Sequence, residues 1–171
     1  NISSVATLGG EPAELPMAAS SPRRPGDAYA LGKAAADEVL FAAHARGELP
    51  LTTFMPAQTW GRQPRLLRQL GFESTWIDRI RKDLPILVAH DGQLIWSHCH
   101  ADDAGVGIAA AVGRERCVGQ TYIVTRFEVA TWRDYHEQVA SALGKRPVFV
   151  DAPADLLIAA WPEGTGLLAR E

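Results

Sequence analysis

Residues 27–56 read DAYALGKAAADEVLFAAHARGELPLTTFMP, and this stretch decides the fold. Asp27 is a typical helix N-cap, the segment from 28 to 46 is rich in Ala and Leu, and Gly47 is a typical helix stop. The apolar, β-branched run from 49 to 55 then predicts a strand that is buried on both faces. A helix followed by a buried strand is half of a βαβ unit, so the sequence predicts an α/β fold.

The remaining segments continue this alternation of strands and helices. The predicted strands are 2–8, 120–125 and 147–150, and the predicted helices are 104–112, 131–143, 154–161 and one or two short ones between 61 and 82. Asp91-Gly92 lies between two apolar runs and predicts a β-hairpin. Asp102 and Asp103 precede a small-residue helix, so we expect one of them to act as its N-cap rather than as one of two catalytic carboxylates.

Composition excludes several classes of function. With 171 residues, of which 47% are hydrophobic and 22% charged, the chain can form a globular core. A net charge of −3 and a pI near 6.0 give no general reason to bind nucleic acid or an anionic membrane. The chain lacks a long apolar run and a signal-peptide pattern, and Cys99 and Cys117 lack CxxC spacing, so we expect a cytoplasmic protein.

The candidate catalytic residues are Tyr29 and Lys33, together with Ser4. Tyr29 and Lys33 are four residues apart on the predicted helix, so both side chains lie on one face. A phenol is a poor acid at neutral pH, and a nearby ammonium favours its ionised form. Tyr29 could therefore exchange a proton with a substrate hydroxyl or carbonyl group.

Several segments in a fixed order carry a family resemblance: residues 3–9 with Ser4, the YxxxK motif at 29–33, 56–61, 98–103, 119–124 and 131–144. Tyr29 follows Ser4 by 25 residues. In this order and spacing the chain resembles the C-terminal half of the short-chain dehydrogenase/reductase superfamily, in its extended, epimerase-like branch.

The resemblance implies a role for each site residue. Tyr29 would be the general acid/base, Lys33 would promote its ionisation and bind the nicotinamide ribose, and Ser4 would donate a hydrogen bond to the reacting oxygen. The implied cofactor is NAD or NADP. The implied cofactor-binding residues are Tyr29, Lys33, Pro56, Ala57, Gln58 and Thr59, and the implied substrate-binding residues are Ser4, Thr7, Trp60 and Arg62.

Three departures from the family pattern limit these implications. Gly105-Val106-Gly107 lacks the third glycine of a phosphate-binding loop, so the resemblance implies a partner N-terminal half that bears this loop. Leu8 and Met55 replace a Tyr and an Arg that are common in sugar epimerases. The substrate is therefore left open between a nucleotide sugar and a natural-product intermediate, and Val5-Ala6-Thr7 lacks the acidic residues of a 4,6-dehydratase.

The start of the chain is also unusual. Asn1-Ile2-Ser3-Ser4 reads like a buried strand already under way, so we expect a fragment or one half of a larger unit. We expect residues 1–61 to form the second half of a Rossmann-like domain. Residues 62–171 would form mainly a substrate-binding lobe, with some segments returning to the main sheet.

Two local patterns have competing interpretations. The basic stretch 60–82 would either grip a substrate diphosphate or form a solvated helix face. His98, Cys99, His100 and Asp102 resemble a metal cluster, but alternation along a strand favours packing roles and no metal site.

The expected function is NAD(P)-dependent hydride transfer at a secondary alcohol or ketone, as a reduction or as an epimerisation. The alternative is a non-catalytic, ligand-binding subunit that completes the fold of another chain, since an uncovered half-sheet would invite pairing. The Ala-rich helix that carries Tyr29 would permit a dimer interface.

Overall fold

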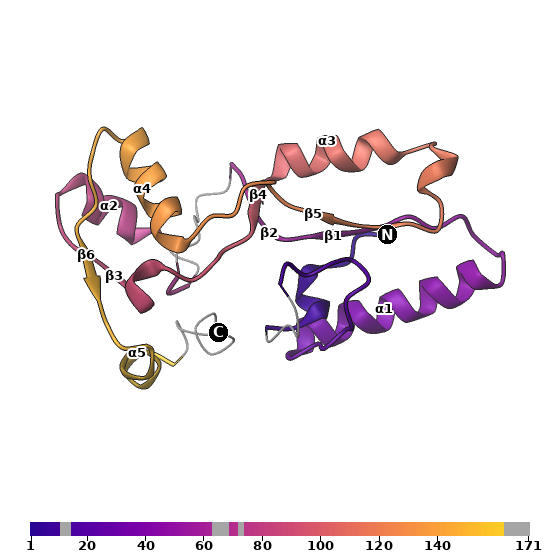
Figure 1. Cartoon of the computed structure of the whole chain (residues 1–171), viewed down its shortest axis with the longest axis horizontal. Helices are drawn as coiled ribbons and strands as arrows, with labels where there is room; N and C mark the ends of the chain where they lie inside the picture. Colours follow the sequence, from indigo (N-terminus) through magenta and orange to yellow (C-terminus); the bar gives the residue numbers. More distant parts are fainter. Residues whose placement is uncertain (11–14, 63–68, 72–73, 163–171) are drawn as a thin grey trace. The chain divides into compact units, whose positions relative to one another are not determined.

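The computed structural model describes residues 1–10, 15–62, 69–71 and 74–162. It divides the chain into two compact units, formed by residues 1–61 with 98–126 and by residues 62–97 with 127–171. Both units combine helices with parallel strands, which confirms the predicted α/β fold class (Figure 1). Among the described residues, none of the helices has the length and hydropathy of a membrane span.

The longest helix of the first unit is α1 (Ala28–Ala45), and its ends lie where the sequence predicts them. The Asp27 carboxylate accepts a hydrogen bond from the Ala30 N–H at 2.8 Å, which satisfies one of the free N–H groups at a helix start. Gly47, just beyond the helix, has a φ of +74°, a conformation that glycine adopts without strain. The buried face consists of small side chains and one carboxylate: Ala30, Ala34, Asp37 and Ala43.

The strands of the first unit are short and parallel. They are β1 (Thr53–Pro56) paired with β5 (Thr121–Val124), and β2 (Gln58–Trp60) paired with β4 (His98–His100). The first three residues of β1 are buried, which confirms a buried strand, although it is shorter than the predicted 49–55 run. On the other edge of β1, Ile2 forms an isolated parallel bridge to Phe54.

The predicted strand 2–8 is wrong beyond its first residues. After the bridge at Ile2, the chain turns into the 3₁₀ helix η1 (Val5–Leu8). Ser4 is the N-cap of this helix, and its Oγ accepts the Ala6 N–H at 3.2 Å. A serine hydroxyl that bonds a nearby backbone N–H offers the chain this alternative to a strand ladder.

The helix α3 (Ala101–Ala111) follows β4 directly and also departs from its prediction. Its N-cap is His100, whose Nδ1 accepts the Asp102 N–H at 3.2 Å, so the prediction of an aspartate N-cap is wrong. Asp102 and Asp103 lie in the first turn, where a negative charge complements the helix dipole. Residues 105–107 lie inside this helix, where they cannot form a phosphate-binding loop after a strand.

The second unit contains one parallel strand pair, three α-helices and a short 3₁₀ helix in its described part. The strands are β3 (Ile86–Val88) and β6 (Phe149–Asp151), and the helices are α2 (Thr75–Arg81), η2 (His90–Gly92), α4 (Trp132–Ala142) and α5 (Ala154–Ala160). The predicted capping box at the start of α4 is confirmed, because Thr131 and Asp134 bond each other's backbone N–H groups. The rest of the helix prediction between 61 and 82 falls partly on 63–68 and 72–73, outside the described residues.

The predicted hairpin around Asp91-Gly92 is wrong. Asp91 and Gly92 do adopt positive φ values of 52° and 70°, as turn residues do, but β3 pairs in parallel with the distant β6. The turn is held by Arg133, whose Nε donates to the Asp91 carbonyl at 2.9 Å and whose guanidinium pairs with the Asp91 carboxylate. The local turn signal was therefore correct, while the pairing of the flanking runs depends on residues far along the chain.

An aromatic cluster forms the core of the second unit. Trp96 and Trp132 stack with ring centroids 3.9 Å apart and an interplanar angle of 11°. Trp76 is completely buried and meets the rings of Tyr135 and His136 at 5.8 and 4.9 Å. Rings of this size supply most of the apolar contact in a small core.

Replacing Trp76 with Ala is expected to destabilise the protein by about 3–5 kcal/mol, because a fully buried ring is lost and leaves a cavity. The measurement is chemical denaturation followed by circular dichroism. Trp161→Ala is the matched control, since Trp161 is 43% exposed and its loss should change stability by less than about 1 kcal/mol. Equal effects of the two substitutions would contradict a core centred on Trp76.

Candidate active site

Tyr29 and Lys33 lie one turn apart on α1, as their spacing predicts. The Lys33 ammonium is 5.9 Å from the centre of the Tyr29 ring. Its Nζ also donates a hydrogen bond to the Ile2 carbonyl at 2.9 Å, so the helix is tied to the segment that precedes Ser4. Tyr29 is 59% exposed, which leaves its hydroxyl accessible to a ligand.

Ser4 is anchored through its backbone and keeps a hydroxyl proton. Its Oγ accepts the Ala6 N–H, and its carbonyl accepts the Thr7 hydroxyl at 2.9 Å. A serine hydroxyl has one proton to donate as well as two lone pairs. Ser4 can therefore donate a hydrogen bond to a reacting oxygen without breaking its contact with Ala6.

Thr7 has a different environment from the one expected of a substrate-binding residue. It is completely buried, its hydroxyl donates to the Ser4 carbonyl, and the same oxygen accepts a hydrogen bond from Arg23. The prediction of direct substrate contact by Thr7 is therefore not supported by this geometry. Thr7 instead supports Ser4 from the protein interior.

The predicted cofactor-binding segment 56–59 begins at the carboxyl end of β1, where ligands bind in open parallel sheets. The Ala57 N–H bonds the Val124 carbonyl at 2.9 Å, which fixes the backbone of this segment. Pro56 and Gln58 are half-buried and Thr59 is exposed, so these side chains remain partly accessible.

Trp60 and Arg62, the other two predicted substrate residues, follow this segment. The ring of half-buried Trp60 meets the edge of the His100 ring at a centroid distance of 4.8 Å. Its buried indole N–H has no hydrogen-bond acceptor among the described residues. Arg62 is exposed and belongs to the second unit.

The histidines and cysteines of β4 do not assemble a metal site in the described part of the chain, where no group of three or more His, Cys, Asp or Glu could hold an ion. Cys99 and Cys117 are both buried and free. Burial, and then the nearby Asp103 carboxylate, raise the pKa of the Cys99 thiol, so it is not an activated nucleophile.

Three residues near Ser4 and Lys33 were missed in the sequence: Ser3, Arg23 and Asp37. Asp37 is 1% exposed, although charged side chains are rarely buried without partners. Its carboxylate accepts the Ser3 hydroxyl at 2.5 Å and pairs with the Arg23 guanidinium at 2.9 Å. The signal was present, because Asp37 follows Lys33 by one helical turn and therefore falls on the same face as Tyr29 and Lys33.

Comparison with known proteins identifies the class to which this arrangement belongs. Residues 1–124 match the NAD dependent epimerase/dehydratase family. Since this match covers most of the chain, the chain belongs to that family. The resemblance to extended short-chain dehydrogenases is thereby confirmed.

Three individual proteins show how similar this chain is to known enzymes in sequence and in fold. The chain is 28% identical over 154 residues to the 2'-dehydrokanamycin reductase of Streptomyces kanamyceticus, a match that covers 90% of this chain and 44% of that protein. In fold it is similar to the UDP-N-acetylglucosamine 4-epimerase from Bacillus cereus, with a TM-score of 0.73, 14% identity, and coverage of 89% of this chain and 51% of that one. It is also similar to the dTDP-glucose 4,6-dehydratase from Bacillus anthracis in complex with NAD, with a TM-score of 0.69, 17% identity, and coverage of 99% and 58%. The chain thus spans about half the length of these relatives.

Proposed function

We propose that this chain is the proton-handling half of an NAD(P)-dependent oxidoreductase that reduces a ketone to a secondary alcohol. The observation that carries the proposal is the joint placement of Tyr29, Lys33 and Ser4. Lys33 lies beside the Tyr29 ring and bonds the Ile2 carbonyl, two residues before Ser4. One contact therefore links the two segments that bear the proposed catalytic groups.

Each residue has one task in this reaction. Bound NAD(P)H supplies a hydride to the carbonyl carbon. The Tyr29 hydroxyl gives its proton to the carbonyl oxygen, so the C–O double bond becomes a secondary alcohol. Ser4 donates a hydrogen bond that stabilises the negative charge developing on that oxygen, and Lys33 stabilises the Tyr29 phenolate that remains.

The donor groups in this chain fit the nicotinamide end of the cofactor. An ammonium has three donors, and one of those on Lys33 is used by the Ile2 carbonyl, which leaves donors for a ribose hydroxyl. The diphosphate needs a glycine-rich loop at a helix start, and the sequence has no G-x-G-x-x-G pattern. We infer that a second half bearing this loop joins the chain, and we call their assembly the complete enzyme.

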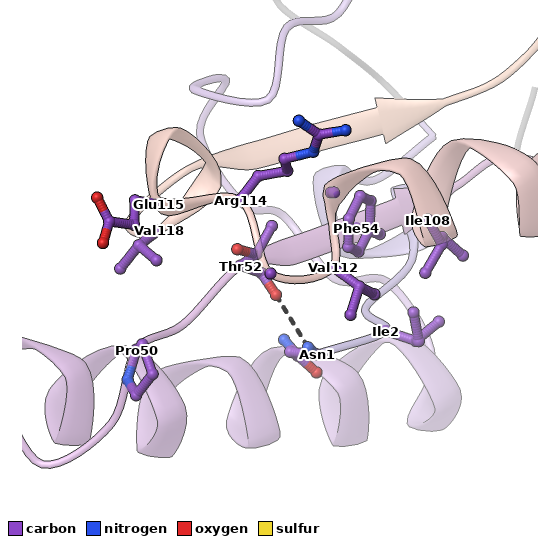
Figure 2. Close-up of a pocket in the computed structure, with 12 residues that line it drawn as sticks. Asn1, Ile2, Pro50, Thr52, Phe54, Ile108, Val112, Arg114, Glu115 and Val118 are labelled. Carbon is purple, nitrogen blue, oxygen red and sulfur yellow. Dashed lines mark hydrogen bonds between the residues drawn. The ribbon is translucent and has the colours of Figure 1, made fainter.

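The surface around the N-terminal segment supports this partner. In the described part of the chain, the segment from 1 to 4 pairs with β1 on one edge and with no strand on the other. A pocket of about 470 Å³ opens beside it, lined on its sides by Ile2 and Phe54 and by Ile108 and Val112 of the α3 end (Figure 2). Ile2 is 46% and Val112 is 76% exposed, so both apolar side chains are accessible to a partner.

Ketone reduction is favoured over epimerisation by the 2'-dehydrokanamycin reductase, since its similarity covers 90% of this chain. The same relative favours a natural-product ketone as the substrate class. The test is to supply the complete enzyme with NADH or NADPH and 2'-dehydrokanamycin and, in a separate assay, with NAD⁺ or NADP⁺ and UDP-N-acetylglucosamine. We expect oxidation of the nicotinamide with the ketone. Interconversion of the sugar nucleotide alone would assign epimerisation, and no reaction with either would favour the non-catalytic, complementing subunit.

A further inference from the structure

A buried ionic cluster lies directly behind the proposed catalytic groups. Asp37 accepts the Ser3 hydroxyl at 2.5 Å and the Asn1 side-chain amide at 2.7 Å, and it pairs with Arg23 at 2.9 Å. Ser3 is only 3% exposed, so this contact is shielded from water. None of these groups has a role in the proton transfer proposed above.

The cluster holds the segment before Ser4 at consecutive residues. Asn1 and Ser3 bond the Asp37 carboxylate, and the Ile2 carbonyl between them accepts Lys33. The same segment is bonded to the backbone of β1, because the Ser3 N–H donates to the Phe54 carbonyl at 2.7 Å. The position of Ser4 relative to α1 is therefore set by Lys33 and Asp37, two side chains one helical turn apart on α1.

Arg23 extends this support to the other side of Ser4. It pairs with Asp37, bonds the Thr7 hydroxyl and lies over the Phe41 ring at 5.6 Å. The Thr7 hydroxyl in turn donates to the Ser4 carbonyl. Ser3, directly, and Thr7, through Arg23, are thus both connected to the Asp37 carboxylate.

An ion pair with one buried partner, such as Asp37 with the partly exposed Arg23, adds little net stability because desolvation offsets much of its attraction, but its hydrogen bonds fix the geometry of the groups that it joins. We propose that Asp37 is a positioning residue that, with Ser3 and Arg23, fixes Ser4 in register with Tyr29 and Lys33. This inference rests on the proposed function for its consequence in catalysis. Its structural part, the control of Ser4 geometry, can be measured independently of turnover.

The test is a double-mutant cycle in the complete enzyme. Ser3→Ala removes the bond between Asp37 and the residue next to Ser4 but leaves the Arg23 pair in place, so the protein should fold. We expect kcat to fall at least about tenfold in the wild-type background and less than about twofold in a Ser4→Ala background. Ser21→Ala is the matched control, because the Ser21 hydroxyl accepts the Ala18 N–H in an exposed turn, and it should leave kcat unchanged.

Hydrogen exchange of the Ala6 amide provides the second readout, since this N–H donates to the Ser4 Oγ. Ser3→Ala and Asp37→Asn should each accelerate this exchange at least about tenfold, and Ser21→Ala should not. Equal losses of kcat in both backgrounds, or unchanged exchange at Ala6, would overturn the positioning role. If the wild type shows no turnover, the proposed function fails, and the exchange rates alone decide whether Asp37 positions Ser4.

Discussion

Tyr29→Phe is expected to lower kcat of the complete enzyme about a thousandfold while leaving nicotinamide binding nearly unchanged. The substitution removes one hydroxyl and keeps the ring beside Lys33, so α1 and its contacts should persist. General acid–base catalysis by a positioned side chain typically contributes about 10²–10⁴-fold. The loss should therefore appear in kcat rather than in cofactor affinity.

The matched control for this substitution is Tyr122→Phe. Tyr122 also belongs to the first unit and stacks on Phe54 at 5.8 Å, but it lies on β5 and has no role in the proposed reaction. Steady-state kinetics with the ketone give kcat, and titration with NAD(P)H gives the cofactor affinity. A Tyr29→Phe variant that retains wild-type kcat would refute the assignment of Tyr29 as the proton donor.

Assembly with a half that bears a glycine-rich loop is expected to tighten NAD(H) binding at least about a hundredfold over this chain alone. Backbone N–H groups at a helix start provide the main site for the cofactor diphosphate. This chain supplies the Tyr29 and Lys33 groups and the segment after β1, which suit the nicotinamide end. Isothermal titration of the chain alone and of the complete enzyme measures the difference.

The surface beside Ile2 can be tested in the same experiment. Val112→Asp places a charge at the apolar pocket and should weaken assembly at least about tenfold. Val148→Asp is the matched control, because Val148 is also exposed, at 53%, but belongs to the second unit. NAD(H) binding by the chain alone that equals binding by the complete enzyme would rule out a missing half.

Local signals in the sequence were sufficient for α1 and α4. The Asp27 cap, the Gly47 stop and the Thr131 capping box act over three or four residues, so their geometry is decided within the helix itself. The parallel strand β5 was predicted for the same reason as β1, from a short run of apolar and β-branched residues between turns.

Long-range pairing explains the wrong hairpin prediction, and a local side-chain cap explains the wrong strand prediction at 2–8. The runs on either side of Asp91 look like two arms of a hairpin, yet β3 pairs with β6 about sixty residues later. Ser4 reads as a strand residue because of its neighbours, but its hydroxyl caps η1. The pairing of β3 depends on a partner that no local pattern specifies, whereas the cap at Ser4 is a local contact that competes with the strand pattern.

The candidate site was predictable only in part. The YxxxK spacing placed Tyr29 and Lys33 on one face because helix geometry is regular. The cluster around Asp37 joins residues 1, 3, 23 and 37, and the loop that brings Arg23 to the helix has no periodic pattern. The sequence offered one sign of this cluster: Asp37 is a charged residue on the face of α1 that must be buried.

Transfer of deuterium from C4 of reduced nicotinamide to the substrate tests the proposed hydride chemistry most directly. The complete enzyme is supplied with each stereoisomer of C4-deuterated NAD(P)H and the ketone, and the alcohol is analysed by mass spectrometry and NMR. We predict one deuterium on the former carbonyl carbon from one stereoisomer and none from the other, with Tyr29→Phe slowing the transfer about a thousandfold. An alcohol that contains no deuterium from either stereoisomer would contradict hydride transfer at this site.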